Sequence, residues 1–221
     1  MPPLKRSSEL EILESQPLPE VVVARTHRDL TRVHWLLGDT RILVKEILRD
    51  PRTVRRVLDV GCGAGGILEQ VRRRLGVDVV GVDLRPPACV PEGLPVIQAD
   101  AVRDPLPAAD VAYSMFLAHH LSEPELIAMI RNVGRSCGRF ILLDLVRHRL
   151  PLALFRLFVA PFLSHVAAAD GCVSIRRAYT PAELRAIVER ALAGTGAQFS
   201  HRVSPWRVRQ IVQIVYKPAG V

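Results

Sequence analysis

The feature that most constrains this chain is a glycine-rich stretch between two regular segments. Residues 57–60 form a largely apolar run that stops in the sequence GCGAGG, and residues 67–75 then carry apolar side chains at helical spacing. Glycine lets the backbone turn sharply and approach a ligand closely, because it lacks the Cβ atom that would block both. A strand, a glycine loop and a helix in this order are typical of the ligand-binding crevice of an open α/β sheet.

The rest of the chain alternates between strand and helix patterns. Apolar runs predict further strands at residues 79–84, 95–99, 111–117 and 140–146, and two extended segments at 197–204 and 207–217 follow near the end. Helices are predicted at 123–136 and 180–192, each opened by capping residues. This alternation predicts an α/β fold with a mostly parallel sheet and an antiparallel edge.

The first fifty residues form a separate layer in this prediction. Residues 1–20 are polar and proline-rich, and we interpret them as a loosely held lead-in with a short helix at 9–15. Residues 21–48 carry apolar side chains at helical spacing on both sides of a break at Gly38-Asp39, which predicts two helices.

The charge and the cysteines exclude several classes of protein. The chain has 30 lysines and arginines against 22 acids, giving a net charge of +8, but the arginines are scattered and outnumber the three lysines. We interpret this as a solvated basic surface, because a nucleic-acid footprint should be clustered. The four cysteines are too far apart in sequence for a zinc motif or disulfide framework, and no apolar signal segment follows the start. A cytoplasmic location is expected.

Asp59 separates two classes of cofactor. The glycines alone fit the G-x-G-x-x-G pattern of nicotinamide-binding proteins, but Asp59 lies two residues before Gly61, at the predicted strand end. A carboxylate there would repel a pyrophosphate, whereas it would attract the ammonium group of an amino-acid tail. S-adenosylmethionine (SAM) carries such a tail, so Asp59 favours SAM over NAD.

Residues 57–65, VLDVGCGAG, resemble the first motif of class I SAM-dependent methyltransferases, written E/D-x-G-x-G-x-G. The resemblance covers residues 50–217 in matching order. It implies a three-layer Rossmann-like fold with a mostly parallel seven-stranded sheet and an antiparallel last strand. It also implies a helical cap at 1–50 and a methyltransferase domain at 51–221, with an insertion covering the acceptor at about residues 147–179.

The resemblance assigns the cofactor contacts. Asp83 matches the acid that binds the ribose hydroxyls, and Asp100 and Ala101 match the pair that binds adenine. The full expected set for SAM, and for its product S-adenosylhomocysteine (SAH), is Asp59, Gly61, Cys62, Gly63, Asp83, Leu84, Asp100, Ala101 and Met115. No metal ion is implied.

The loop after the fourth strand points to a small acceptor. It lacks the Asn/Asp-Pro-Pro-Tyr cluster of enzymes that methylate DNA bases and the carboxylates of the metal-dependent catechol type. Its His-His-Leu ending resembles methyltransferases of quinone, phenolic and phosphobase pathways. An oxygen is the first candidate for the methylated atom, and a carbon is the second. A histidine with a pKa of about 6.5 suits deprotonation of a phenol, so His120, and after it His119, are the candidate bases. The alternative is that they cap the next helix or line the pocket.

The acceptor site is expected under the insertion and the N-terminal helices. Residues 147–162 are rich in phenylalanine and are interpreted as a pocket roof, with ordinary core, a membrane surface or a partner subunit as alternatives. The candidate acceptor contacts are His34, Trp35, Phe116, Phe155, Arg176 and Tyr179.

The sequence therefore predicts a SAM-dependent methyltransferase for a small apolar or aromatic acceptor, of the kind found in bacterial secondary metabolism. Peripheral membrane contact and a homodimer stay open, and nucleic acid is not expected as a partner. The alternatives are an RNA methyltransferase, which the basic charge suggests, and a SAM-binding protein without catalysis.

Overall fold

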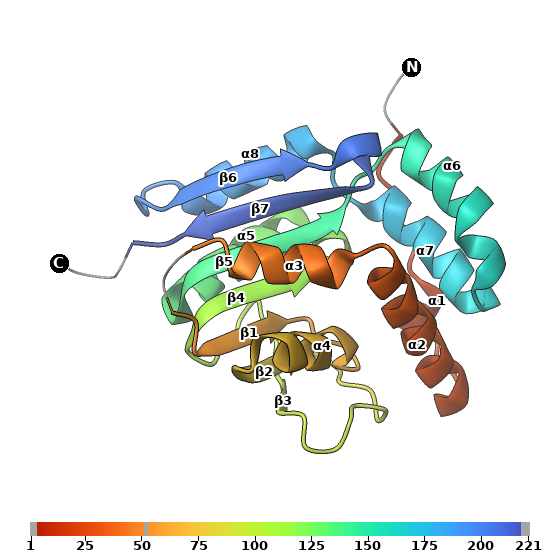
Figure 1. The fold of residues 1–221 in the computed structure, drawn as a ribbon. Coiled ribbons are helices and arrows are strands. Elements are labelled where there is room, and N and C mark those ends of the chain that lie inside the picture. Colours follow the sequence, from red (N-terminus) through yellow and green to blue (C-terminus); the bar gives the residue numbers. More distant parts are fainter. Residues whose placement is uncertain (1–3, 51–52, 218–221) are drawn as a thin grey trace.

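A computed structural model describes residues 4–50 and 53–217, and its centre is a seven-stranded sheet with the order β3-β2-β1-β4-β5-β7-β6 (Figure 1). Strands β1 to β5 run parallel, and β7 runs antiparallel to both β5 and β6. The strands are β1 (Arg56–Val60), β2 (Asp78–Asp83), β3 (Val96–Gln98), β4 (Ala109–Met115), β5 (Cys137–Leu145), β6 (Gln198–Val203) and β7 (Arg209–Val215). The predicted Rossmann-like fold with an antiparallel last strand is confirmed.

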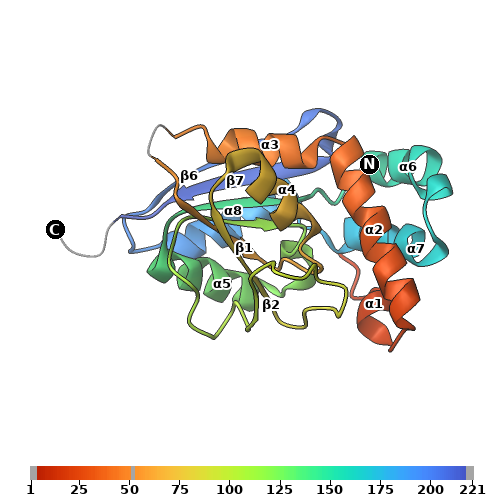
Figure 2. The same ribbon diagram turned by 60° about the horizontal axis from the view of Figure 1, so that its bottom comes forward.

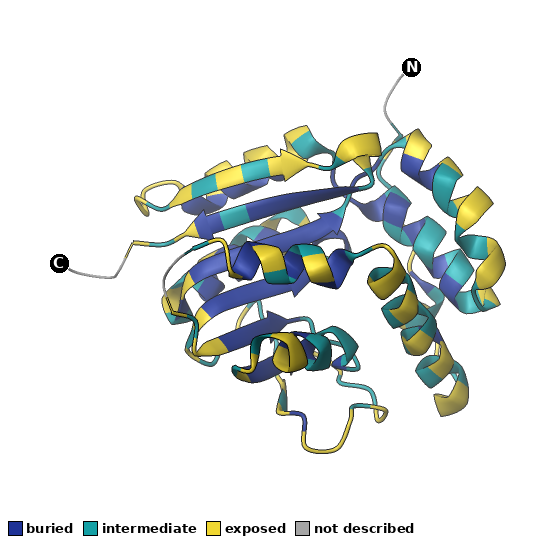
Figure 3. Cartoon of the chain, viewed as in Figure 1, coloured by how far each residue is buried: buried dark blue, intermediate teal, exposed yellow. Residues whose placement is uncertain are grey.

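The central strands are buried because helices cover both faces of the sheet (Figure 3). Helices α3 (Asp39–Ile47) and α4 (Gly66–Leu75) lie on one face, and α5 (Glu123–Ser136) and α8 (Pro181–Leu192) lie on the other (Figure 1). Leu43 and Tyr113 belong to the apolar cluster of the first face, and Phe140 and Ile187 to that of the second. A strand covered on both faces reads as a continuous apolar run, as β5 does.

Local signals define most helix ends. Gly38 has a φ of 74°, a left-handed conformation that glycine adopts at low cost, and it separates α2 (Glu20–Leu36) from α3 as predicted. Ser122 and Thr180 open α5 and α8 with reciprocal capping boxes. The predicted boundary between residues 50 and 51 falls at the edge of the described residues, since residue 51 lies outside them.

Four helices form a cap beyond the carboxyl ends of the parallel strands (Figures 1 and 2). They are α1 (Ile12–Ser15), α2, α6 (Arg149–Phe158) and α7 (His165–Arg177). Short 3₁₀ turns complete the elements: η1 (Ala118–His120), η2 (Ala160–Phe162) and η3 (Pro205–Arg207). None of the helices in the described ranges is long and apolar enough to cross a membrane.

Two parts of this cap differ from the sequence prediction. Residues 4–16 are not loosely held, because the Arg6 guanidinium donates to the carbonyl oxygens of Arg177 and Leu121 at 2.7 and 2.9 Å. The sequence analysis predicts no helix between residue 162 and the capping box at 180, but residues His165–Arg177 form helix α7. Both segments are held by contacts with residues far away in the sequence.

Candidate active site

The glycine loop leaves β1 at the carboxyl edge of the sheet. Gly61, Gly63 and Gly65 have φ angles of 79°, 52° and 73°. A Cβ on Gly61 would lie 2.7 Å from the Leu117 side chain. The left-handed conformation favours glycine at Gly61, and a Cβ there would also displace the Leu117 side chain.

Two acids stand beside this loop. Oδ2 of Asp83 accepts a hydrogen bond of 2.8 Å from the Gly63 N–H, which fixes the loop against the end of β2. Asp59 is buried and accepts a hydrogen bond of 2.8 Å from the Tyr113 hydroxyl. Burial raises the pKa of Asp59 to about 7; Asp83 adds to this rise, and the bond from Tyr113 opposes it. Asp59 is thus poised to ionise when a cation lies beside it.

The loop and helix α2 enclose a first cavity of about 170 Å³. His27 of α2 lies over Gly63, where its ring carbon is 3.6 Å from the place a Cβ would occupy. The lining residues are His27, Leu30, Thr31, His34, Asp59, Gly61, Cys62, Gly63, Ala64, Gly66, Ile67, Met115 and Phe116. Left-handed glycines and a buried acid fit the close approach and the ammonium group of SAM, so the residues present fit this cofactor.

Four of the expected cofactor residues lie outside the lining of this cavity: Asp83 at the end of β2, and Leu84, Asp100 and Ala101 along the edge toward β3. Leu84 is exposed and directly follows β2. Asp100 and Ala101 follow β3, and Oδ1 of Asp100 accepts a hydrogen bond of 2.9 Å from the Val102 N–H. They lie at the end of the sheet where the resemblance places the adenosine part of SAM.

A second cavity of about 360 Å³ adjoins the first. Most of its wall is apolar and comes from α2, α6 and α7, including Val33, Leu154, Phe155, Phe158 and Ile175. It shares Leu30, His34 and Phe116 with the first cavity. The rings of His34 and Phe116 stack with centroids 4.3 Å apart and thus form part of the partition.

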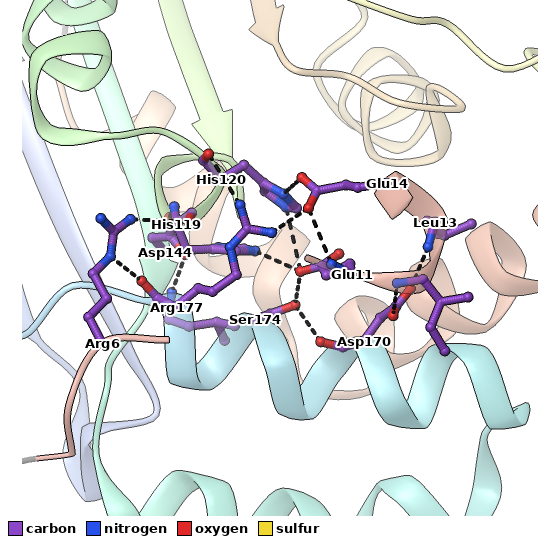
Figure 4. Close-up of polar contacts among 12 residues, drawn as sticks. Arg6, Glu11, Leu13, Glu14, His119, His120, Asp144, Asp170, Ser174 and Arg177 are labelled. Atoms are coloured by element: carbon purple, nitrogen blue, oxygen red, sulfur yellow. Dashed lines mark hydrogen bonds and ion pairs between the residues drawn. The ribbon is translucent and has the colours of Figure 1, made fainter. Parts of the chain in front are cut away.

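The polar end of this second cavity is built around His119 (Figure 4). Nδ1 of His119 lies 2.8 Å from Oδ1 of Asp144, and Nε2 lies 3.5 Å from Oε1 of Glu11. Burial alone would lower the pKa of His119, but Asp144 and Glu11 outweigh it and raise that pKa to about 9. With these neighbours, the imidazole is protonated at neutral pH.

His120 is more accessible and has a different partner. Nδ1 of His120 lies 2.5 Å from Oε1 of Glu14, whose other oxygen pairs with Arg177. Burial raises the pKa of Glu14, but His120 and Arg177 lower it more, to about 2. An ionised Glu14 holds the proton of His120 on Nδ1 and leaves Nε2 as the basic atom.

The acids of this cluster were not predicted from the sequence. Glu11 and Glu14 lie on the N-terminal segment, and 106 residues separate Glu14 from His120. No spacing pattern connects partners so far apart. Asp144 had a usable signal, because it stands near the end of an apolar strand, as Asp59 and Asp83 do.

The structure divides the expected acceptor residues into two groups. His34, Phe116 and Phe155 line the second cavity. Trp35 is exposed, and Arg176 pairs with Glu9 at the surface. Tyr179 is buried, where its hydroxyl donates to the Leu121 carbonyl at 2.8 Å beneath the Arg6 guanidinium. These three residues lie outside the cavity lining.

The strand order, the antiparallel β7 and a glycine loop flanked by acids at the ends of β1 and β2 define the class I SAM-dependent methyltransferase fold. Residues 57–138 match the sequence model of a family described as a methyltransferase domain. Residues 57–138 therefore have the sequence of a methyltransferase domain, and they lie within a class I SAM-dependent methyltransferase fold.

Similar solved structures agree in fold. The plantazolicin methyltransferase BpumL, in complex with a monoazolic desmethylPZN analogue and SAH, superposes with a TM-score of 0.68 at 13% identity, covering 89% of each chain. Human N-acetylserotonin methyltransferase in complex with SAM gives 0.64 at 14% identity, covering 90% of this chain and 56% of that one. The methyltransferase domain of bacterial CtHen1-C superposes with a TM-score of 0.58 at 15% identity, covering 81% of this chain and 97% of that one. No curated protein matches the sequence.

Proposed function

We propose that the protein transfers a methyl group from SAM to a small apolar or aromatic acceptor. The atom methylated is proposed to be an oxygen, with a carbon as the second candidate. The observation that carries this proposal is the pair of adjoining cavities. The first lies on the glycine loop, the second is apolar with one polar end, and both are bounded by Leu30, His34 and Phe116. A cofactor and an acceptor in these cavities would meet at that boundary.

The second cavity supports the class of acceptor. Its volume of about 360 Å³ suits a small organic molecule rather than a polymer. Phe155 and Phe158 offer ring faces to an aromatic group, and the only histidines in its wall besides His34 are His119 and His120. An acceptor with an apolar body and one ionisable hydroxyl matches this distribution. One solved structure of the same fold is named after a small-molecule acceptor, N-acetylserotonin.

His120 is the proposed base. SAM supplies a methyl group on a positively charged sulfur, so little is needed beyond alignment and a deprotonated acceptor. Glu14 orients His120, and Nε2 takes the acceptor proton as the new O–CH₃ bond forms and the S–CH₃ bond breaks. His119, held by Asp144 and Glu11, is proposed to donate a hydrogen bond to the developing oxyanion and so position the acceptor.

The setting of the enzyme is part of the proposal. We propose that the enzyme is cytoplasmic and acts in bacterial secondary metabolism. The exposed apolar side chains of Leu36, Phe158 and Phe162 support contact of the cap with a membrane surface or a second subunit.

The test is an assay of SAH formation with a panel of phenols and hydroxyquinones, alongside calorimetry with SAM. We expect SAM to bind and His120→Ala to lower turnover about 10²- to 10⁴-fold at unchanged SAM affinity. His165→Ala is the matched control, because His165 is exposed at the start of α7. Binding of NAD in place of SAM would overturn the proposal. Normal turnover in both His119→Ala and His120→Ala would remove the histidines from it.

A further inference from the structure

A cluster of potential metal ligands lies at the polar end of the acceptor cavity. Glu11, His119 and His120 each direct one ligand atom into a space where all three atoms lie within 4.8 Å of one another. All three residues line the cavity, and they come from the N-terminal segment and from η1 (Figure 4). No metal ion was expected from the sequence, because the loop after the fourth strand lacks the carboxylates of the metal-dependent type. Glu11, which supplies the carboxylate here, lies far from the histidine pair in the sequence.

The distances within this cluster are too long for hydrogen bonds. Oε1 of Glu11 lies 3.5 Å from Nε2 of His119 and 3.8 Å from Nε2 of His120. A direct N–H···O hydrogen bond spans about 2.7–3.2 Å. Two ligand atoms held at about 2.1 Å by one tetrahedral ion lie about 3.4 Å apart. The spacing is therefore closer to that of ligands around an ion than to that of a direct bond.

The opposite ring nitrogens are anchored as metal-binding histidines usually are. Nδ1 of His119 lies 2.8 Å from Asp144, and Nδ1 of His120 lies 2.5 Å from Glu14. Such carboxylates fix the ring orientation, and an ion bound at Nε2 would displace the proton that His119 carries at neutral pH in the metal-free protein. Both histidines of the cluster have this second partner, and both Nε2 atoms face Glu11.

We propose that Glu11, His119 and His120 form a binding site for a first-row divalent metal ion of the zinc type. Two imidazoles and one carboxylate are a ligand set that zinc, cobalt and iron(II) accept, and further coordination positions are left open. The ligands line the acceptor cavity, so an open position faces the space proposed for the acceptor.

This inference rests on the proposed function and deepens it. An ion at this place lowers the pKa of a hydroxyl bound to it and holds its oxygen in place. With an ion bound, Nε2 of His120 would be a ligand rather than the base, and the acidified hydroxyl would release its proton to solvent water. The acceptor class then narrows to molecules with an oxygen donor that can bind the ion.

The first experiment is a titration of the purified, chelator-treated protein with Co²⁺, followed by visible absorption, and competition of the bound Co²⁺ by Zn²⁺. We expect one equivalent of Co²⁺ with d–d bands that Zn²⁺ removes. Glu11→Gln should weaken Zn²⁺ binding about 30-fold or more, and Glu14→Gln about 10- to 100-fold through His120. The matched control is Glu9→Gln, because Glu9 lies on the same segment but pairs at the surface with Arg176.

The outcomes separate the two proposals. No saturable binding of Co²⁺ or Zn²⁺, or equal affinity in Glu11→Gln and Glu9→Gln, overturns the metal site. SAM binding and methyl transfer that persist after chelation in such a protein leave the proposed function intact. Loss of SAM binding in a protein that still binds Co²⁺ refutes the methyltransferase function and leaves the metal site standing. Thermal unfolding of each variant shows whether it is folded.

Discussion

At the scale of single residues, Asp59 connects the sequence motif to the cofactor. Its position could be read from the chain, because the strand, the acid and the glycines are neighbours in sequence. The pKa of Asp59 could not be predicted from the sequence, because it depends on burial and on Tyr113, a residue of another strand. Glu11 and Glu14 show the same limit more strongly, because folding alone brings them to the histidines.

The raised pKa of Asp59 predicts a pH dependence of SAM binding. In the free protein this carboxyl has a pKa of about 7, so it is ionised above pH 7 and neutral below. The ammonium group of SAM favours the ionised form, so affinity should fall as pH decreases through 7 and be about tenfold weaker at pH 6 than at pH 8. Calorimetry at several pH values measures this change.

Two variants control this prediction. Asp59→Asn has no carboxyl to titrate, so its weaker SAM binding should show no step near pH 7. Tyr113→Phe removes the hydrogen bond that lowers the pKa of Asp59, so its step should move to higher pH. If SAM affinity in Asp59→Asn still changed by the same amount near pH 7, the pH dependence would belong to another group.

At the scale of elements, the strands, the capped helices and the N-terminal helices were predictable, and helix α7 of the cap was not. Apolar runs and capping boxes are local signals, and they located β1, β5, α5 and α8. Helix α7 has a glycine in its interior, Gly171, which weakens the sequence signal for a helix. A Cβ on Gly171 would lie 2.3 Å from the Phe155 ring, so the close packing of α6 on α7 requires this glycine.

Helix α2 predicts a testable coupling with the glycine loop. A Cβ on Gly66 would lie 2.7 Å from Oγ1 of Thr31, although the backbone of Gly66 is not left-handed. Gly66→Ala should therefore push α2 from the loop, cost about 1–3 kcal/mol of unfolding free energy and weaken SAM binding. In a Thr31→Ala background the same change should be nearly neutral. Chemical denaturation of the wild type, the two single variants and the double variant gives the coupling free energy between positions 31 and 66.

The control for this cycle is Gly138→Ala. A Cβ at Gly138 meets no atom within 4 Å, and the residue lies near the start of β5, away from α2. Gly138→Ala should change the free energy of unfolding by the same amount whether position 31 is Thr or Ala. If Gly66→Ala also costs the same in both backgrounds, α2 does not lie on the loop in solution as the structure has it.

At the scale of the whole molecule, the excess of arginine is partly internal. Arg147, Arg177 and Arg209 are buried and pair with Glu183, Glu14 and Asp39. The Arg72–Arg74 run, the only one of its kind in the chain, lies on α4, where Arg72 and Arg73 pair with Glu69. Many of the basic side chains therefore hold elements together or have acidic partners, a distinction that net charge alone does not make.

This distribution predicts weak, non-specific binding of RNA. Proteins that bind nucleic acid through a basic surface lose about 10³- to 10⁵-fold in affinity between 50 and 200 mM salt, because many phosphate contacts release counterions. We expect a shallower dependence here, with at most a few phosphate contacts. Fluorescence anisotropy with single-stranded and duplex RNA at both salt concentrations measures it. A steep dependence with tight binding, together with methylation of the RNA, would instead favour an RNA methyltransferase over the small-molecule enzyme.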